Sequence, residues 1–118
     1  MINFENNPLI QKTVIFSLDI IEFWKILEEK RKFVIAKQLL RSGTRIGANS
    51  FEAQKKKKKN DFINKIKIAA KELEETKYWL YLCKHSKSYP FDEKLEQQII
   101  EIGKILYKIL STSLNKDK

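Results

Sequence analysis

Residues that break helices are scarce in this sequence. Three glycines and two prolines occur among 118 residues, and no proline lies between Pro8 and Pro90. A β-sandwich or barrel needs a tight turn about every 8–12 residues, and such turns depend on glycine and proline. The stretches between the breakers are instead long, and their apolar residues recur at helical spacing. The sequence therefore predicts an all-α fold.

Four helices are predicted, at about residues 8–29, 33–56, 60–84 and 91–114. Asn7 and Pro8 suit a helix start, because asparagine caps the first turn and proline is tolerated there. Short connections between helices of similar length favour an antiparallel up-down four-helix bundle that forms a single domain over residues 1–118. The clearest periodicity is in the fourth helix, at Leu95, Ile99, Ile102, Leu106 and Ile109.

The first predicted helix has a wide apolar sector. One stripe consists of Val14, Leu18, Ile21 and Trp24, and another of Phe16, Ile20, Phe23 and Leu27. At about 100° per residue the sector spans about 220°, roughly twice the width that an ordinary surface helix needs. One face would serve the core of the domain and the other a second subunit. We therefore expect a homo-oligomer, with Phe16, Phe23 and Trp24 as candidate interface residues.

Gly43 and Gly47 lie within the second predicted helix, where each costs about 1 kcal/mol relative to alanine. Because they are four residues apart, they leave a groove without side chains into which a neighbouring helix can pack closely. The alternative is a phosphate-binding loop, but no strand precedes the segment and no Gly-rich fingerprint matches. We expect both glycines to be helix-packing residues.

The whole chain has a net charge of +9, and its positive charge is concentrated in one segment. Residues 30–71 contain 14 Lys or Arg against only Glu52 and Asp61, a balance of +12, whereas the rest contains 10 basic and 13 acidic residues, a balance of −3. Such segregation indicates a polyanionic partner. Drift in an A+T-rich genome would also enrich lysine, but it explains the segregation less well.

Two groups of basic residues are candidate nucleic-acid contacts. Lys37, Arg41 and Arg45 project from the polar side of the second helix, where planar guanidinium groups suit phosphate. Consecutive lysines occupy the connection to the third helix: Lys55, Lys56, Lys57, Lys58 and Lys59. The alternatives are a solvated helix face, with Arg41 or Arg45 paired to Glu52, and a solvated connection. Lysine contacts to phosphate carry no base preference.

We expect no catalytic residue, metal site or cofactor. Cys83 and His85 are the only cysteine and histidine, and side chains two residues apart on a helix diverge. Glu72 and Glu75 could share a helix face, but we expect them to pair with Lys71, Lys77 or the basic helix of a neighbour. We expect a cytoplasmic protein without membrane contact. The sequence has a single cysteine, no basic signal-peptide start and no long apolar span.

The segments KQLLRSGTRIGANSFEAQ and DFINKIKIAAKELEETKYWLYL resemble the four-helix bundle family known as 23S rRNA intervening-sequence proteins. The resemblance covers about residues 8–110 and is densest over 37–82, where it includes residues 39–44, 47–49, 52–53, 62, 71–72, 75–76 and 78–80. Phe51 departs from the family pattern, in which a small or aliphatic residue is usual, so packing near Gly47 can differ.

The resemblance implies a bundle that assembles into a ring, with a pentamer as the expected form, and it supplies no catalytic residues. Some relatives lie in reading frames inside ribosomal RNA genes, and similar proteins are accessory subunits of reverse transcriptases. Two functions therefore stay open. One is a ring that binds nucleic acid, with RNA favoured, and the other is a scaffold or accessory subunit that docks an acidic protein such as a reverse transcriptase.

Overall fold

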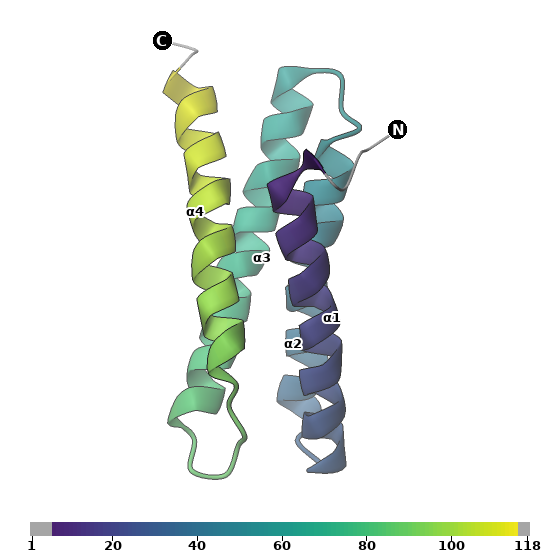
Figure 1. Cartoon of the computed structure of the whole chain (residues 1–118), viewed down its shortest axis with the longest axis vertical. Helices are drawn as coiled ribbons and strands as arrows, with labels where there is room; N and C mark the ends of the chain where they lie inside the picture. The colour runs from purple at the N-terminus through teal and green to yellow at the C-terminus, as the bar shows by residue number, and fades with distance from the viewer. Residues whose placement is uncertain (1–5, 116–118) are drawn as a thin grey trace.

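The computed structural model describes residues 6–115, which form four helices and no strand. The helices are α1 (Pro8–Glu29), α2 (Phe33–Ala53), α3 (Lys59–His85) and α4 (Glu93–Asn115). Each packs against two neighbours, in the order α1, α2, α3, α4 and back to α1, and the backbones of the diagonal pairs stay farther apart than those of neighbours. The α1–α2 and α3–α4 connections lie at one end and the α2–α3 connection at the other (Figure 1). The predicted antiparallel up-down bundle is confirmed.

The start of α1 has the predicted cap. The side-chain oxygen of Asn7 accepts a hydrogen bond from the backbone N–H of Ile10 at 3.2 Å, and Pro8 occupies the first turn. Asn7 thereby satisfies one of the backbone donors that the start of a helix leaves without an intrahelical partner.

Arg31 makes the turn between α1 and α2. Its φ is 61°, in the left-handed region that residues other than glycine seldom adopt. The backbone N–H groups of Arg31 and Lys32 donate to the carbonyls of Glu28 and Leu27 at 2.9 and 2.8 Å, which closes the end of α1. Because the segment EEKRK contains neither glycine nor proline, no local signal in the sequence marks this boundary.

The second helix is shorter than predicted, since α2 ends at Ala53 rather than near residue 56. The backbone N–H of Gln54 donates to the carbonyl of Phe51 at 3.1 Å, and the next two residues repeat this three-residue spacing. Continuing the helix through the lysines would stack like charges three and four positions apart, which is unfavourable. The remaining boundaries differ little, with α3 starting at Lys59 and α4 at Glu93.

One stripe of each helix forms the core. On α1 this stripe consists of Phe16, Ile20, Phe23 and Leu27, whose side chains are at most 3% exposed. The assignment of Phe16 and Phe23 to a subunit interface is therefore wrong, because the stripe that contains them faces the interior of its own chain. Trp24 is half-buried and packs against the same core.

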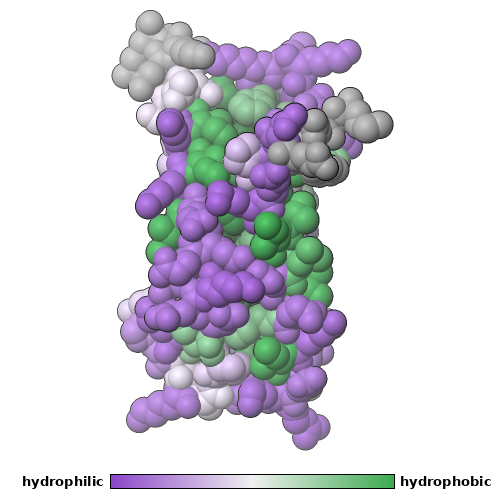
Figure 2. All heavy atoms as spheres, in the orientation of Figure 1, coloured by the Kyte–Doolittle hydropathy of each residue, from purple (hydrophilic) through white to green (hydrophobic). Residues whose placement is uncertain are grey.

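The outer side of α1 has large apolar residues that are between 42% and 58% exposed. Val14 and Leu18 belong to the predicted wide apolar sector, and Ile15 and Ile26 lie beside it. Hydrophobic residues are visible along the side of the molecule on which α1 lies (Figure 2). Among the helices of residues 6–115, none combines the length and apolar character needed to cross a bilayer.

Gly43 and Gly47 lie against α1. A Cβ built on Gly43 would be 3.1 Å from Cγ1 of Ile20, and one built on Gly47 would be 3.1 Å from Cβ of Thr13. Both distances are shorter than an ordinary van der Waals contact between carbons. A methyl group at either position would require the α1 side chain to shift by a few tenths of an ångström, and a larger side chain would push α1 away from α2.

Candidate nucleic-acid interface

The lysine run (residues 55–59) lies at the end of the bundle where α2 passes into α3 (Figure 1). All of these lysines are exposed, and hydrophilic side chains project from this end of the molecule (Figure 2). Nζ of Lys55 lies 4.7 Å from the centre of the Phe51 ring, a cation–π contact. No ion pair within residues 6–115 involves Lys56, Lys57 or Lys58.

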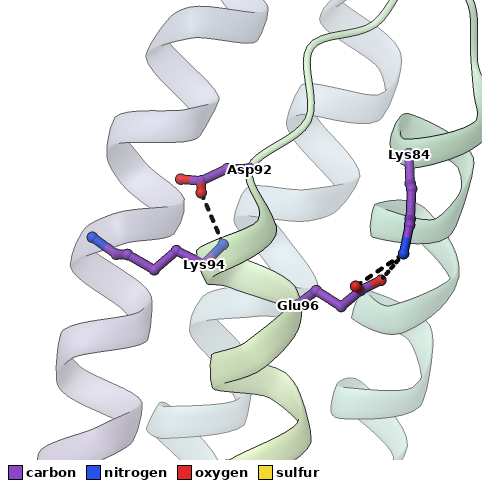
Figure 3. A network of polar contacts seen from close by, with 4 residues as sticks. All are labelled: Lys84, Asp92, Lys94 and Glu96. Carbon is purple, nitrogen blue, oxygen red and sulfur yellow. Dashed lines mark hydrogen bonds and ion pairs between the residues drawn. The ribbon is translucent and has the colours of Figure 1, made fainter.

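Two lysines near the opposite end of the bundle are paired with carboxylates. Nζ of Lys84 lies 3.0 and 3.1 Å from the two oxygens of Glu96 (Figure 3). Nζ of Lys94 lies 3.2 Å from Oδ2 of Asp19, and its backbone N–H donates to Oδ1 of Asp92 at 3.0 Å (Figure 3). No ion pair within residues 6–115 involves Lys30 or Lys87 at this end, so what distinguishes the α2–α3 end is that five exposed lysines are consecutive there.

Glu52, the acid that precedes the lysine run on α2, is engaged by α3. Nζ of Lys65 lies 2.8 Å from Oε2 of Glu52. The hydrogen bond and the charge of Lys65 lower the pKa of Glu52, with smaller contributions from two residues of the lysine run. Glu52 thus pairs with Lys65, and not with Arg41 or Arg45.

The other predicted basic residues are exposed on α2: Lys37, Arg41 and Arg45. The register between α2 and α3 determines what lies beside them. Oγ1 of Thr76 on α3 is 2.8 Å from Oγ of Ser42 on α2, in a buried contact. Arg45 follows Ser42 by about one turn, and Glu72 precedes Thr76 by about one turn. Because the helices are antiparallel, Arg45 and Glu72 come to the same level of the bundle.

Glu72 is a half-buried carboxylate whose Oε2 atom is buried without a hydrogen-bond partner among residues 6–115. Burial raises the pKa of Glu72 and the charge of Glu75 raises it further, whereas Arg45 and Arg41 act in the opposite direction. Glu75 itself accepts a hydrogen bond from Nε1 of Trp79 at 3.0 Å. The middle of the α2–α3 face thus combines two guanidinium groups with a carboxylate oxygen that has no donor.

Sequence reasoning pairs Glu72 and Glu75 with Lys71, Lys77 or the basic helix of a neighbour, whereas Nζ of Lys77 lies 3.6 Å from Oε2 of Glu74. Only the register of α2 against α3 brings Glu72 to the level of Arg45. The sequence signal for that register is the pair of small polar residues Ser42 and Thr76 at core-facing positions, and a single sequence does not show that these two residues meet.

The groups considered for catalysis do not come together. Cys83 is buried, which raises its pKa to about 11 and keeps the thiol protonated at neutral pH. His85 is exposed, and its ring centre lies 4.3 Å from that of Tyr81. Within residues 6–115, no group of three His, Cys, Asp or Glu side chains is placed to hold a metal ion.

A groove of about 480 Å³ lies between α1 and α2. Val14 and Leu18 of α1 and Phe51 of α2 supply large apolar side chains, and Gly47 and Ala48 leave room between them. The first residue of the lysine run also lines the groove. An apolar surface of this kind, rimmed by charge, is typical of a protein-docking site.

Comparison with known proteins places the chain in a family. The sequence model of the 23S rRNA-intervening sequence protein family matches residues 5–108. A crystal structure of a protein of unknown function from the S23 ribosomal protein family of Bacteroides thetaiotaomicron VPI-5482 is 40% identical, with a TM-score of 0.81, and the match covers 86% of this chain and 97% of that one. No curated protein matches the chain. A family match over most of the chain, together with this shared four-helix structure, shows that the chain belongs to the 23S rRNA-intervening sequence protein family.

Proposed function

We propose that the protein binds nucleic acid, with RNA favoured over DNA, through the lysine run and the exposed basic face of α2. The observation that carries the proposal is the run of five consecutive exposed lysines, of which Lys56, Lys57 and Lys58 form no ion pair within residues 6–115. Such lysines favour association because their contacts release counterions condensed on the phosphate backbone. The family name connects relatives with 23S rRNA, which supports RNA as the partner.

The two basic groups make different contributions. The lysine run supplies flexible point charges, so it accounts for most of the salt-dependent affinity. Arg41 and Arg45 lie one turn apart on a helix, and their planar guanidinium groups can each form two parallel hydrogen bonds to a phosphate, so their contribution is to position it. Binding is therefore weak in sequence preference and strong in salt dependence.

Fluorescence anisotropy with a labelled single-stranded RNA and a DNA of the same sequence, between about 50 and 200 mM salt, tests this function. The triple variant Lys56→Gln, Lys57→Gln, Lys58→Gln should lower affinity for every sequence alike. It should also flatten the slope of log affinity against log salt by about 0.7 for each phosphate that the variant no longer neutralises.

A matched variant controls for net charge. Lys84→Gln, Lys87→Gln and Lys94→Gln together remove the same number of lysines from the other end of the bundle. This control should leave the salt slope nearly unchanged. Equal decreases in affinity for the two triple variants would contradict a localised site, and no binding of either nucleic acid at the low-salt end would rule the function out.

A second candidate function is protein docking, and the apolar outer face of α1 with the adjoining groove favours it. The occupant is another copy of this chain, in the ring that the family resemblance predicts, or an acidic partner such as a reverse transcriptase. We propose self-association through Val14, Ile15, Leu18 and Ile26, since these side chains are exposed and large. Docking is the function that stands if no nucleic acid binds.

A further inference from the structure

The groove between α1 and α2 is continuous with the lysine run. Lys55 lines the groove and is also the first residue of that run. Val14 and Leu18 on the α1 side are exposed, so the groove is open to a ligand that arrives from solvent. A ligand that the lysine run binds can therefore extend into the groove.

Phe51 lines this groove and has a flexible side chain over its ring. Nζ of Lys55 lies 4.7 Å from the centre of the ring, and an exposed contact between a cation and a ring is weak. Gly47 and Ala48 precede Phe51 by about one helical turn and place no bulky side chain in the groove. A flat ligand would therefore reach the ring by displacing the side chain of Lys55.

A hydroxyl group lies where α1 faces α2 in the groove. Oγ of Ser17 points towards Gly47, since a Cβ built on Gly47 would be 3.5 Å from it. The Ser17 hydroxyl forms no hydrogen bond within residues 6–115, whereas the hydroxyl of Thr13, one turn earlier, donates to the carbonyl of Ile10 at 3.1 Å. Because a hydroxyl both donates and accepts, Ser17 adds one polar group to a groove that is otherwise largely apolar.

The charge around the groove favours an anionic ligand. Glu52 also lines the groove, but Nζ of Lys65 lies 2.8 Å from its Oε2 atom and compensates this carboxylate. The lysine run continues from Lys55 without an acidic residue. A fitting ligand therefore has a planar ring for Phe51, a hydrogen-bonding edge for Ser17 and phosphate for the lysines. A nucleotide unit combines these features, whereas an aliphatic segment from another copy of the chain supplies apolar contact alone.

We infer that one base of a single-stranded nucleic acid enters the groove and stacks on Phe51 while the adjoining phosphates contact the lysine run. The inference rests on the proposed nucleic-acid function and specifies how the strand is held. The base displaces the ammonium group of Lys55 from the ring, and this group then contacts phosphate. Every base has a π-face, so such stacking tolerates any sequence. A base inside a duplex is already stacked on its neighbours and does not enter the groove.

The experiment measures anisotropy with two labelled single strands of equal length: an RNA, and the same RNA with stable abasic residues in place of its nucleotides. Both strands have the same number of phosphates and differ in their bases. The unaltered protein should bind the RNA more tightly by on the order of tenfold, as expected for a base that stacks on an aromatic side chain. The slope of log affinity against log salt should be the same for both strands, because stacking releases no counterions.

Two variants test the groove itself. Phe51→Ala removes the stacking surface, and Ala48→Leu fills the groove from an exposed position of α2. In both variants the preference for the RNA should fall towards one, and the abasic strand should bind as it does to the unaltered protein. Ala48→Leu removes no side chain from the packed structure, so it remains informative if Phe51→Ala loses its fold. Phe33→Ala is the matched control, because it removes an exposed phenylalanine from the other end of α2 and should leave the preference unchanged.

Equal binding of the RNA and the abasic strand by the unaltered protein would overturn the inference and leave the proposed function standing. An equal loss of preference in Phe33→Ala and Phe51→Ala would also overturn it. If Ala48→Leu keeps the preference and dissociates an oligomer in light scattering, the groove holds a second copy of the chain and the inference is wrong. If neither strand binds at low salt, the proposed function fails along with the inference.

Discussion

At Gly47 a hydrogen atom occupies the place where a side chain would separate α1 from α2, since a Cβ there would lie 3.1 Å from Cβ of Thr13. We expect Gly47→Leu to destabilise the fold by about 1–3 kcal/mol, because the added side chain must push the two helices apart. Thermal unfolding followed by circular dichroism measures the effect. An unchanged melting temperature would mean that the helices can separate here at no cost.

Gly103 provides the control for helix propensity. A Cβ on Gly103 would be 3.6 Å from its nearest neighbour, Cδ2 of Leu73, which is an ordinary contact. Alanine is favoured over glycine within a helix by about 1 kcal/mol. Gly103→Ala should therefore raise the melting temperature, opposite to the effect at Gly47.

Glu72 gives the fold a pH-dependent stability. Folding raises the pKa of its carboxyl, chiefly through burial. Protonation of Glu72 therefore stabilises the folded state. This stabilisation is complete at acid pH and is lost as the pH rises through the pKa that Glu72 has in the folded protein. Glu72→Gln is neutral at every pH, so at pH 7 it should be more stable than the unaltered protein by on the order of 1 kcal/mol.

Melting curves between about pH 7 and pH 4, near the usual pKa of a glutamate, measure this difference. It should shrink as the pH falls, because Glu72 then becomes protonated in the unaltered protein. Glu22→Gln controls for the general loss of a negative charge, as Glu22 is exposed beside Lys25. A stability gain of Glu72→Gln that is the same at every pH would show that its burial is not the cause.

Among the elements of residues 6–115, the end of α1 is the one with a strained residue, since Arg31 has a φ of 61°. Glycine adopts this conformation at no steric cost, and it is the usual residue at such a helix end. Arg31→Gly should raise the melting temperature by the equivalent of about 1 kcal/mol. Lys30→Gly is the control, because Lys30 has a φ of −87°, where glycine brings only extra freedom to the unfolded chain. A loss of stability in both variants would contradict the assignment of strain to Arg31.

The elements also show how far the sequence predicts the structure. Helix periodicity locates the four helices, and the cap at Asn7 locates the start of α1 to the residue. Periodicity does not show which of the two apolar stripes of α1 faces the core, because both have the same spacing, and the interface assignment of Phe16 and Phe23 is wrong for that reason. Glu72 and Arg45 lie at the same level because of the register between α2 and α3. The apolar pattern within a single helix does not predict how that helix is aligned with its neighbour.

At the scale of the whole molecule, the exposed outer face of α1 predicts an assembly. Val14→Asp with Leu18→Asp should convert an oligomer into a monomer by light scattering and leave the helix content unchanged, because these side chains are 45% and 58% exposed. Phe23→Asp should instead unfold the chain, since Phe23 is 3% exposed and an unpaired buried charge is costly. A monomeric unaltered protein at micromolar concentration would contradict the assembly.

An antiparallel bundle places equal numbers of helix N-termini and C-termini at each end, so the helix dipoles nearly cancel along its long axis. The lysine run has no such counterpart, and it leaves the molecule with an electric moment that points towards the α2–α3 connection. In the field of an extended polyanion a diffusing molecule of this kind turns before contact and arrives with that end first. The rate of encounter, and not only the strength of the final complex, should then fall steeply as ionic strength rises.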